Sequence, residues 1–288
     1  MTTAIPPVRK LGVVGLGYIG LPTAALFASR GVAVAGLDVA AHVVETVNRG
    51  GVHIVEPGLD IAVRSAVASG LFRASTKAEP CDAFIIAVPT PFRDGNVPDV
   101  SFIDAAADAL APVLREGNLV VLESTSPVGT TRAIAERFQR LRPDLRFPAR
   151  ERAGENVFVA YCPERVLPGN VMRELIENDR VVGGLTPAST ARAISLYKQL
   201  VEGECIASEA ETAEMVKLTE NAYRDVNIAF ANELSLVCDR LRLNVWDVIK
   251  LANHHPRVNI LRPGRASAGT ASRSIPGSSS TPRRRKRA

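Results

Sequence analysis

The chain has 288 residues and a net charge of +5, with 46% hydrophobic and 23% charged residues. This composition excludes a wholly disordered chain, a collagen-like chain and a small disulfide scaffold, and no segment has the roughly 18 consecutive apolar residues of a membrane helix. The positive charge comes from residues 261–288, which contain eight Lys and Arg and no acid. Because residues 1–260 carry 27 basic and 30 acidic side chains, we expect no nucleic-acid partner.

Short apolar runs alternate with helical stretches in the first half of the chain. The strand-like runs are 11–14, 32–37, 83–88, 119–122 and 157–160. The helix candidates between them include 21–29, 39–49, 60–68 and 102–114. The runs are apolar on both faces, as strands buried between two helix layers are. The alternation therefore predicts an α/β fold with a doubly wound, Rossmann-type parallel sheet.

One long helix is predicted in the second half of the chain. Ser208 and Glu211 have the spacing of a capping box, so we expect the helix to start at Ser208. Apolar residues then recur on one face to about Arg242, a length on the order of 50 Å. They are Val216, Tyr223, Val226, Phe230, Leu234, Val237 and Leu241. Such a helix is either the core of a second domain or a spine between domains or subunits, and the sequence leaves both open.

The composition changes after Pro263. Residues 264–288 are dominated by Ser, Gly, Pro and Arg, and Ile275 is their only large aliphatic side chain. Such a segment buries too little apolar surface to order itself. We therefore expect a Rossmann domain over residues 1–205, a helical domain over 206–263 and a disordered basic tail over 264–288.

The cysteines point to a reducing compartment. Cys81, Cys162, Cys205 and Cys238 lie far apart and form no CxxC pair. We therefore expect free thiols, a cytoplasmic protein and no metal site. The first ten residues contain two prolines and lead straight into an apolar run, a pattern unlike a secretory signal.

A glycine-rich turn, GLGYIG at residues 15–20, follows the first strand-like run. In a dinucleotide-binding turn the first glycine makes the bend, the second admits a pyrophosphate, and the third lets the helix pack on the strand. Asp38 ends the second strand-like run, where a carboxylate accepts from a ribose 2′-hydroxyl and repels a 2′-phosphate. The sequence therefore predicts NAD rather than NADP as the cofactor.

Polar turns also follow three later strand-like runs, at residues 88–91, 123–131 and 161–170. Ligands of open α/β sheets bind at the carboxyl ends of the strands, so these turns are candidate ligand contacts. Helix capping and surface ion pairs are the alternative interpretations. On the long helix, Lys217 and Asn221 lie one turn apart and point the same way. Arg224, His255 and Arg257 either bind an anion or lie on a solvated surface.

Seven segments carry a resemblance that extends over residues 8–264. They are GLGYIGLP (15–22), EPGLD (56–60), VPTP (88–91), ESTSPVGTT (123–131), YCPERVLPGN (161–170), AEMVKLTENAYRDVNIAFANELS (213–235) and HPRVNILRPG (255–264). Together they resemble the UDP-glucose/GDP-mannose dehydrogenase family, and the fifth and sixth look most like its branch that acts on UDP-N-acetyl-D-mannosamine. The resemblance implies oxidation of a sugar C6 alcohol to a carboxylate in two steps, with two NAD⁺ reduced. UDP-N-acetylglucosamine and UDP-glucose are the alternative substrates.

The resemblance also implies roles for the polar residues. Lys217 and Asn221 would stabilise an oxyanion, and Glu164 would act as the acid or base. The implied substrate contacts are Arg165, Val166, Lys217, Asn221, Arg224, His255 and Arg257. The implied cofactor contacts are Gly15, Gly17, Tyr18, Ile19, Gly20, Asp38, Thr90, Thr125 and Thr131. Members of this family pair their subunits through the long helix, so we expect a homodimer through residues 209–242.

The sequence departs from the family after Gly264. The family carries a nucleophilic cysteine in a segment that reads GVGGHCIAVDPWFIV, whereas residues 265–272 here read RASAGTAS. The family's C-terminal nucleotide-binding domain is not found in the sequence either. We therefore expect a truncated dehydrogenase without turnover, or a non-catalytic remnant that binds NAD and dimerises.

The genetic code suggests a cause for this departure. Codons permitted for residues 265–282, read one nucleotide out of frame, spell GVGGHCIAVDPWFIV followed by Asp and Ala. A random tail would very rarely permit this, so we expect that one nucleotide was lost near Gly264. The gene sequence past that codon is the measurement, and a neighbouring frame without the motif would contradict the hypothesis.

Overall fold

The computed structural model describes residues 5–94, 97–149 and 154–264. These residues fall into two compact units. Unit 1 comprises Met1–Pro91 and Pro98–Met215, and unit 2 comprises Phe92–Val97 and Val216–Ala288, each as far as it is described. The domain boundaries expected at residues 205 and 263 stay predictions, and the tail expected to be disordered lies outside the described residues apart from Gly264.

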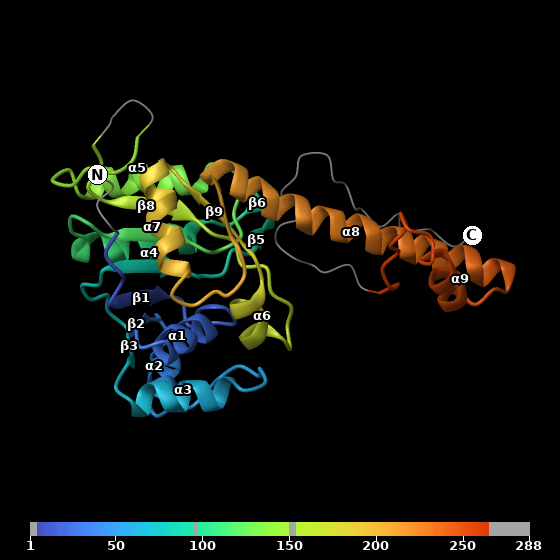
Figure 1. Ribbon diagram of the computed structural model, residues 1–288, viewed down its shortest axis with the longest axis horizontal. Coiled ribbons are helices and arrows are strands. Elements are labelled where there is room, and N and C mark those ends of the chain that lie inside the picture. Colours follow the sequence, from blue (N-terminus) through green and yellow to red (C-terminus); the bar gives the residue numbers. More distant parts are fainter. Residues whose placement is uncertain (1–4, 95–96, 150–153, 265–288) are drawn as a thin grey trace. The chain divides into compact units, whose positions relative to one another are not determined.

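Unit 1 is built on an eight-stranded sheet in the order β10-β9-β8-β7-β4-β1-β2-β3. Figure 1 shows β1, β2 and β3 of this sheet next to the helices α1 (Gly20–Ser29) and α2 (Ala41–Asn48). Its strands are β1 (Lys10–Val14), β2 (Ala33–Leu37), β3 (Phe72–Ser75), β4 (Ala83–Ile86), β7 (Leu119–Leu122), β8 (Phe158–Tyr161), β9 (Arg180–Gly184) and β10 (Cys205–Glu209). The predicted Rossmann-type α/β fold is confirmed. The sheet is not wholly parallel, however, because β9 runs antiparallel to β8, pairing Gly183 with Tyr161.

Each face of the sheet in unit 1 carries its own apolar core, because successive strand side chains point to opposite faces. On β1, for example, Val13 belongs to one core and Val14 to the other. The first core is covered by α1 (Gly20–Ser29), α2 (Ala41–Asn48), α3 (Leu59–Ala68), α6 (Val171–Glu177) and α7 (Pro187–Tyr197). The second is covered by α4 (Ser101–Leu110), α5 (Thr130–Leu141) and the first turn of α8 (Ala210–Leu241). Burial on both faces explains why the predicted strands read as continuous apolar runs.

The long helix α8 has 32 residues and begins two residues later than predicted. Ser208, the expected N-cap, lies in β10 and pairs with Gly183 of β9. Its carbonyl oxygen accepts a hydrogen bond from the Thr190 hydroxyl at 3.3 Å. The capping-box interpretation was wrong because the sheet ladder takes the backbone at this position. The predicted end of the helix is confirmed, since Arg242 turns into the left-handed region with φ of 58°.

Unit 2 contains most of α8, the short helix α9 (Val245–Ala252) and the segment up to Gly264. Two asparagine side chains hold this last segment, because each side-chain amide both donates to and accepts from the backbone of one residue in it. Asn253 donates to the Ile260 carbonyl and accepts from its amide, at 3.0 and 2.7 Å. Asn232 does the same for Gly264, at 2.8 and 2.9 Å. A separate two-stranded sheet joins β5 (Phe92–Arg93) to β6 (Val97–Pro98).

Within the described parts of the chain, no helix is both long enough and apolar enough to cross a membrane.

Candidate functional site

The turn between β1 and α1 is shaped by glycines at positions where a side chain does not fit. Gly15 has φ of 89°, and a Cβ there would lie 2.7 Å from the Ala87 carbonyl oxygen. A Cβ on Gly20 would lie 1.8 Å from the Gly15 carbonyl oxygen, so any larger residue would push α1 away from β1. Gly17 faces open space, where a ligand phosphate can approach the backbone.

Helices α1, α5 and α6 are among those that begin after parallel strands and therefore at the carboxyl edge of the sheet. The N-termini of α5 and α6 are already bonded to buried carboxylates, those of Glu214 and Glu56. Helix α1 has no side-chain cap and no acid in its first turn. Because the first N–H groups of a helix lack intrahelical acceptors and attract anions, the start of α1 fits the pyrophosphate of a dinucleotide.

Asp38 lies at the end of β2 with both carboxylate oxygens anchored. The Leu16 amide donates to Oδ2 and the Ala40 amide donates to Oδ1, each at 2.9 Å. A carboxylate held at this position can accept from a ribose hydroxyl through its remaining lone pairs and repels a 2′-phosphate. The open side of Gly17, the uncapped α1 and the anchored Asp38 therefore fit NAD.

The predicted cofactor threonines lie in two loops that are bonded to each other. The Thr90 hydroxyl donates to the Thr125 carbonyl oxygen and the Ser124 hydroxyl donates to that of Val88, both at 2.7 Å. These bonds join the loops after β4 and β7. Thr131 is placed differently, because it is fully buried and its hydroxyl and amide donate to Glu214 at 2.6 and 2.8 Å. Its hydroxyl supports the start of α5, and its cofactor contact stays a prediction.

The loop after β8 brings Glu164, Arg165 and Val166 to the same edge of unit 1. The Glu164 carboxylate accepts a hydrogen bond from the Val166 amide and so folds back on its own loop. The Arg165 guanidinium donates to the Asp179 carbonyl oxygen at 3.2 Å, and Val166 packs against the apolar core under α1. The loop is therefore held on the C-terminal side of Glu164.

A buried ion pair, which the sequence did not reveal, lies below this edge. Glu123 at the end of β7 and Arg180 at the start of β9 are each 2% exposed, with their nearest atoms 3.4 Å apart. The Arg180 guanidinium also lies over the Tyr197 ring, 5.4 Å from its centroid. Burial raises the pKa of Glu123 to about 7, and the nearby Arg180 charge opposes this rise.

The buried cysteines are poor candidates for a nucleophile, because only the thiolate attacks. Burial raises the pKa of Cys162 to about 12 and that of Cys81 to about 11. Cys238 is also buried, and Cys205 is partly exposed with a pKa raised by burial. The part of the chain that is described contains no group of three His, Cys, Asp or Glu that could hold a metal ion.

The other predicted site residues belong to unit 2. Lys217, Asn221 and Arg224 follow one another on α8 at spacings of four and three, which puts them on one face. Lys217 and Asn221 are half-buried, whereas Arg224 is exposed. His255 and Arg257 are exposed after α9, where the His255 Nδ1 atom accepts from the Arg257 amide at 3.3 Å. Their roles in binding and catalysis stay predictions.

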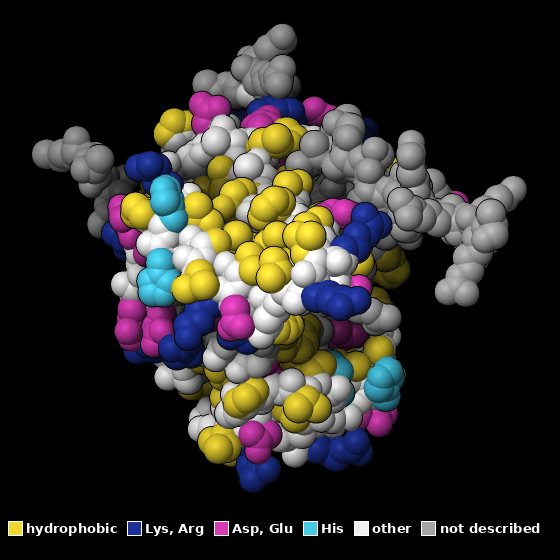
Figure 2. Space-filling view, turned by 90° about the vertical axis from the view of Figure 1, so that its right-hand side faces the viewer, with side chains coloured by type: hydrophobic (Ala, Val, Ile, Leu, Met, Phe, Trp, Pro, Cys, Tyr) yellow, Lys and Arg dark blue, Asp and Glu magenta, His cyan; other side chains and the backbone are white. Residues whose placement is uncertain are grey.

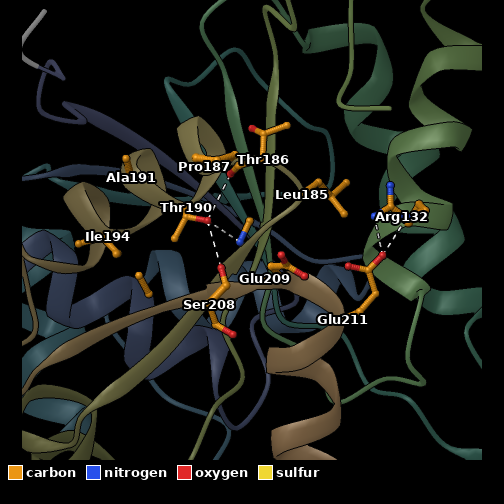
Figure 3. A pocket seen from close by; sticks show the side chains of 12 residues that line it. Arg132, Leu185, Thr186, Pro187, Thr190, Ala191, Ile194, Ser208, Glu209 and Glu211 are labelled. Carbon is orange, nitrogen blue, oxygen red and sulfur yellow. Dashed lines mark hydrogen bonds and ion pairs between the residues drawn. The ribbon is translucent and has the colours of Figure 1, made fainter. Parts of the chain in front are cut away.

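A cavity of about 570 Å³ lies along β10 and α7 in unit 1. Figure 3 shows side chains that line it. Its polar groups are bonded to one another. Arg132 points at Glu211 and donates to it twice, at 2.8 and 2.6 Å. The Thr190 hydroxyl accepts from the Gly184 amide at 2.9 Å and also contacts the carbonyl oxygens of Thr186 and Ser208. This cavity lacks the open amides that the start of α1 offers.

Comparison with known proteins places the chain in a family. Residues 9–201 match the NAD binding domain of the UDP-glucose/GDP-mannose dehydrogenase family, and residues 211–274 match its central domain. The chain belongs to this family. Unit 1 of this UDP-glucose/GDP-mannose dehydrogenase homologue therefore carries the family's NAD-binding fold, and the predicted family and cofactor are confirmed.

Individual relatives are similar over most of this chain. It is 60% identical to the UDP-N-acetyl-D-mannosamine dehydrogenase of Yersinia pestis and 59% identical to the NDP-N-acetyl-D-galactosaminuronic acid dehydrogenase of Ralstonia nicotianae. Each comparison covers 91% of this chain and 62% of the relative. The structure of UDP-D-ManNAc dehydrogenase from Pyrococcus horikoshii matches with a TM-score of 0.83 and 41% identity, over 88% of this chain and 60% of that one. The chain thus spans about 62% of the length of these curated relatives.

The anchored carboxylate of Asp38 gives a prediction for cofactor binding. The chain should bind NAD⁺ more tightly than NADP⁺, and Asp38→Ala should weaken NAD⁺ binding by roughly 1–3 kcal/mol because a charged hydrogen-bond acceptor for the ribose is lost. Isothermal titration calorimetry with both cofactors measures this. Asp60→Ala, an exposed acid on α3, is the control and should leave the affinity unchanged. Equal affinities of the parent chain for NAD⁺ and NADP⁺ would contradict the role of Asp38.

The buried Glu123 gives a prediction for stability against pH. Its folded-state pKa of about 7 lies above the ordinary 4.5, so the folded state holds the proton more tightly. The stability due to this group is complete below pH 4.5 and is lost as the pH rises through 7, by on the order of 1–3 kcal/mol. Urea denaturation at pH 5, 6, 7 and 8 should show a shallower decline for Glu123→Gln than for the parent. Identical declines of the unfolding free energy in the parent and in Glu123→Gln would rule out a protonated buried carboxyl. Glu202→Gln, at an exposed position, is the control and should decline like the parent.

Proposed function

We propose that this chain provides the NAD-binding and central parts of a dehydrogenase that oxidises the C6 alcohol of UDP-N-acetyl-D-mannosamine to UDP-N-acetyl-D-mannosaminuronate. The observation that carries the proposal is the glycine turn at residues 15–20 with Asp38 anchored beside it, in a chain whose described edge also holds Glu164. The names of the Yersinia and Pyrococcus relatives support the choice of sugar.

In the first oxidation, a hydride leaves C6 and the hydroxyl proton leaves the oxygen. NAD⁺, when bound, accepts the hydride. Glu164 is the proposed proton acceptor, directly or through a water. The Lys217 ammonium and the Asn221 amide would stabilise the negative charge that develops on the oxygen as the proton departs. Arg224 and Arg257 would bind the diphosphate of the substrate, since guanidinium groups match phosphate oxygens.

The second oxidation requires a covalent nucleophile in this scheme. A thiolate adds to the aldehyde, loss of a second hydride to a second NAD⁺ gives a thioester, and water then releases the acid and the free thiol. The high thiol pKa values of Cys81 and Cys162 argue against either in this role. We therefore propose that the 288-residue chain by itself does not complete the reaction.

The sugar has alternatives with testable differences. UDP-N-acetylglucosamine and UDP-glucose differ from the proposed substrate in configuration or substitution at C2. The name of the Ralstonia relative adds a galactosamine derivative to the panel. All four sugars share the reacting C6 alcohol. Differences between their turnover rates therefore report on how the sugar is bound rather than on the oxidation itself.

A second candidate function is a non-catalytic subunit that binds NAD and dimerises. An exposed apolar face on α8 favours it, with Tyr223, Val226, Phe230, Val237 and Leu241 each 49–67% exposed. Trp246 and Leu251 of α9 are also more than half exposed, and Figure 2 shows hydrophobic side chains gathered on the face that it presents. A surface of this kind is typical of a protein–protein contact. We propose that a second copy of the chain covers the α8 face.

Turnover gives a direct test of the catalytic proposal. We expect no uronic acid when the chain is mixed with NAD⁺ and each of the four UDP-sugars, because the second oxidation lacks its covalent nucleophile and such a loss costs many orders of magnitude in rate. A chain with its reading frame shifted by one nucleotide after Gly264 should form the uronic acid, and fastest from UDP-N-acetyl-D-mannosamine. Lys217→Ala in that chain should abolish the activity. Robust formation of the uronic acid by the 288-residue chain would show that the nucleophile has been misplaced.

The oligomeric state tests the role of the α8 face. Multi-angle light scattering at micromolar concentration should give the mass of a dimer. Phe230→Glu should shift the chain toward the monomer, because it places a charge in the apolar contact. Phe102→Glu, at a 45% exposed position on α4, is the matched control and should leave the dimer intact. A parent chain that runs as a clean monomer would refute the dimer.

A further inference from the structure

Glu56 belongs to the EPGLD segment, to which the proposed function gives no role. It precedes α3, is 7% exposed and accepts three hydrogen bonds. The Tyr18 hydroxyl and the Gly169 amide both donate to Oε2, at 2.7 and 3.0 Å. The Val171 amide donates to Oε1 at 2.8 Å. Burial alone would raise the pKa of this carboxyl, but the three donors outweigh it and the pKa lies below its usual value.

The three donors come from two parts of the candidate site. Tyr18 lies inside the glycine turn where the pyrophosphate is expected to bind. Gly169 and Val171 close the loop that begins at Cys162 and carries Glu164. Gly169 has φ of 89°, and the Asn170 amide donates to the Leu167 carbonyl oxygen at 3.1 Å, so this end of the loop is a tight turn. Glu56 thus bonds the cofactor turn directly to the loop with the candidate acid or base.

The Oε2 atom of Glu56 accepts from both Tyr18 and Gly169, so the two hydrogen bonds depend on each other. Oε2 has to satisfy Tyr18 and Gly169 at once, so a displacement of the tyrosine changes the geometry available to the loop amide. Both bonds are charge-assisted, and such bonds are shorter and stronger than bonds between neutral groups. A ligand that settles on the backbone of the glycine turn therefore acts on the loop through one side chain.

We propose that Glu56 is a positioning residue that couples occupation of the cofactor turn to the order of the 162–170 loop, and through it to the placement of Glu164. The proposal rests on the NAD site described above. In the chain without cofactor the loop exchanges between more conformations. Cofactor on the turn fixes Tyr18, Tyr18 fixes the Glu56 carboxylate, and the carboxylate holds Gly169 and Val171.

Hydrogen–deuterium exchange of the 288-residue chain tests this coupling without any turnover. We expect saturating NAD⁺ to slow exchange in peptides covering residues 162–171 by at least about threefold. Tyr18→Phe removes one donor to Glu56 and leaves the two loop amides bonded to it, so the response to NAD⁺ should disappear. Glu56→Gln should raise the basal exchange and also remove the response.

Glu174→Gln is the matched control. The Glu174 carboxylate accepts from the Leu167 amide at 2.8 Å, so this variant loosens the same loop without touching Tyr18 or Glu56. It should raise the basal exchange and keep the response to NAD⁺. Calorimetry on each variant sets a saturating NAD⁺ concentration, so a weakened affinity does not imitate a lost response.

The outcomes separate this inference from the proposed function. Binding of NAD⁺ with no slowing in the parent chain overturns the coupling and leaves the cofactor site intact. An unchanged response in Tyr18→Phe also overturns it, because the signal then bypasses Glu56. Failure of the folded parent chain to bind NAD⁺ at all would instead remove the NAD site, and this inference with it.

Discussion

The close approach of Gly15 and Gly20 is the constraint on which the rest of the candidate site depends. With 1.8 Å between the Gly15 carbonyl oxygen and a hypothetical Cβ on Gly20, α1 can lie against β1 only if residue 20 lacks a side chain. That contact fixes where the first N–H groups of α1 point. It also brings the Leu16 amide to Asp38 and the Tyr18 hydroxyl to Glu56. One steric condition therefore places the anion site, the ribose acceptor and the link to the neighbouring loop.

Buried acids distinguish the starts of α5 and α6 from the start of α1 at this edge. Glu214 and Glu56 supply negative charge to the N-termini of α5 and α6, where unpaired amides would otherwise require water or a ligand. The start of α1 receives no such side chain. A phosphate that approaches the edge thus finds the start of α1 open, whereas the starts of α5 and α6 already hold a carboxylate. The helix start that a phosphate can occupy is therefore determined by the positions of the buried acids as much as by the glycines.

The sequence predicted the features of this fold that depend on near neighbours. The apolar strands, the turn at residues 15–20 and the end of α8 all follow from local pattern and backbone preference. The capping box at Ser208 failed because the same local pattern was overruled by pairing with β9. The contacts of Glu123 with Arg180 and of Glu56 with Gly169 join residues 57 and 113 positions apart, and no spacing rule connects such pairs. The antiparallel direction of β9 was missed for the same reason, since strand direction is set by partners far away in the chain.

Asp38 has a consequence for how this fold can change during evolution. Its two carboxylate oxygens accept hydrogen bonds from the Leu16 and Ala40 amides. The group that would discriminate between NAD and NADP therefore also holds the backbone of the cofactor site in place. A mutation that replaces Asp38 to accommodate the 2′-phosphate of NADP breaks the hydrogen bonds to both amides at once. The path to the other cofactor therefore passes through a loosened intermediate unless a second change restores those bonds. Proteins descended from such a chain would therefore keep NAD as their electron carrier, even where NADP would suit their metabolism better.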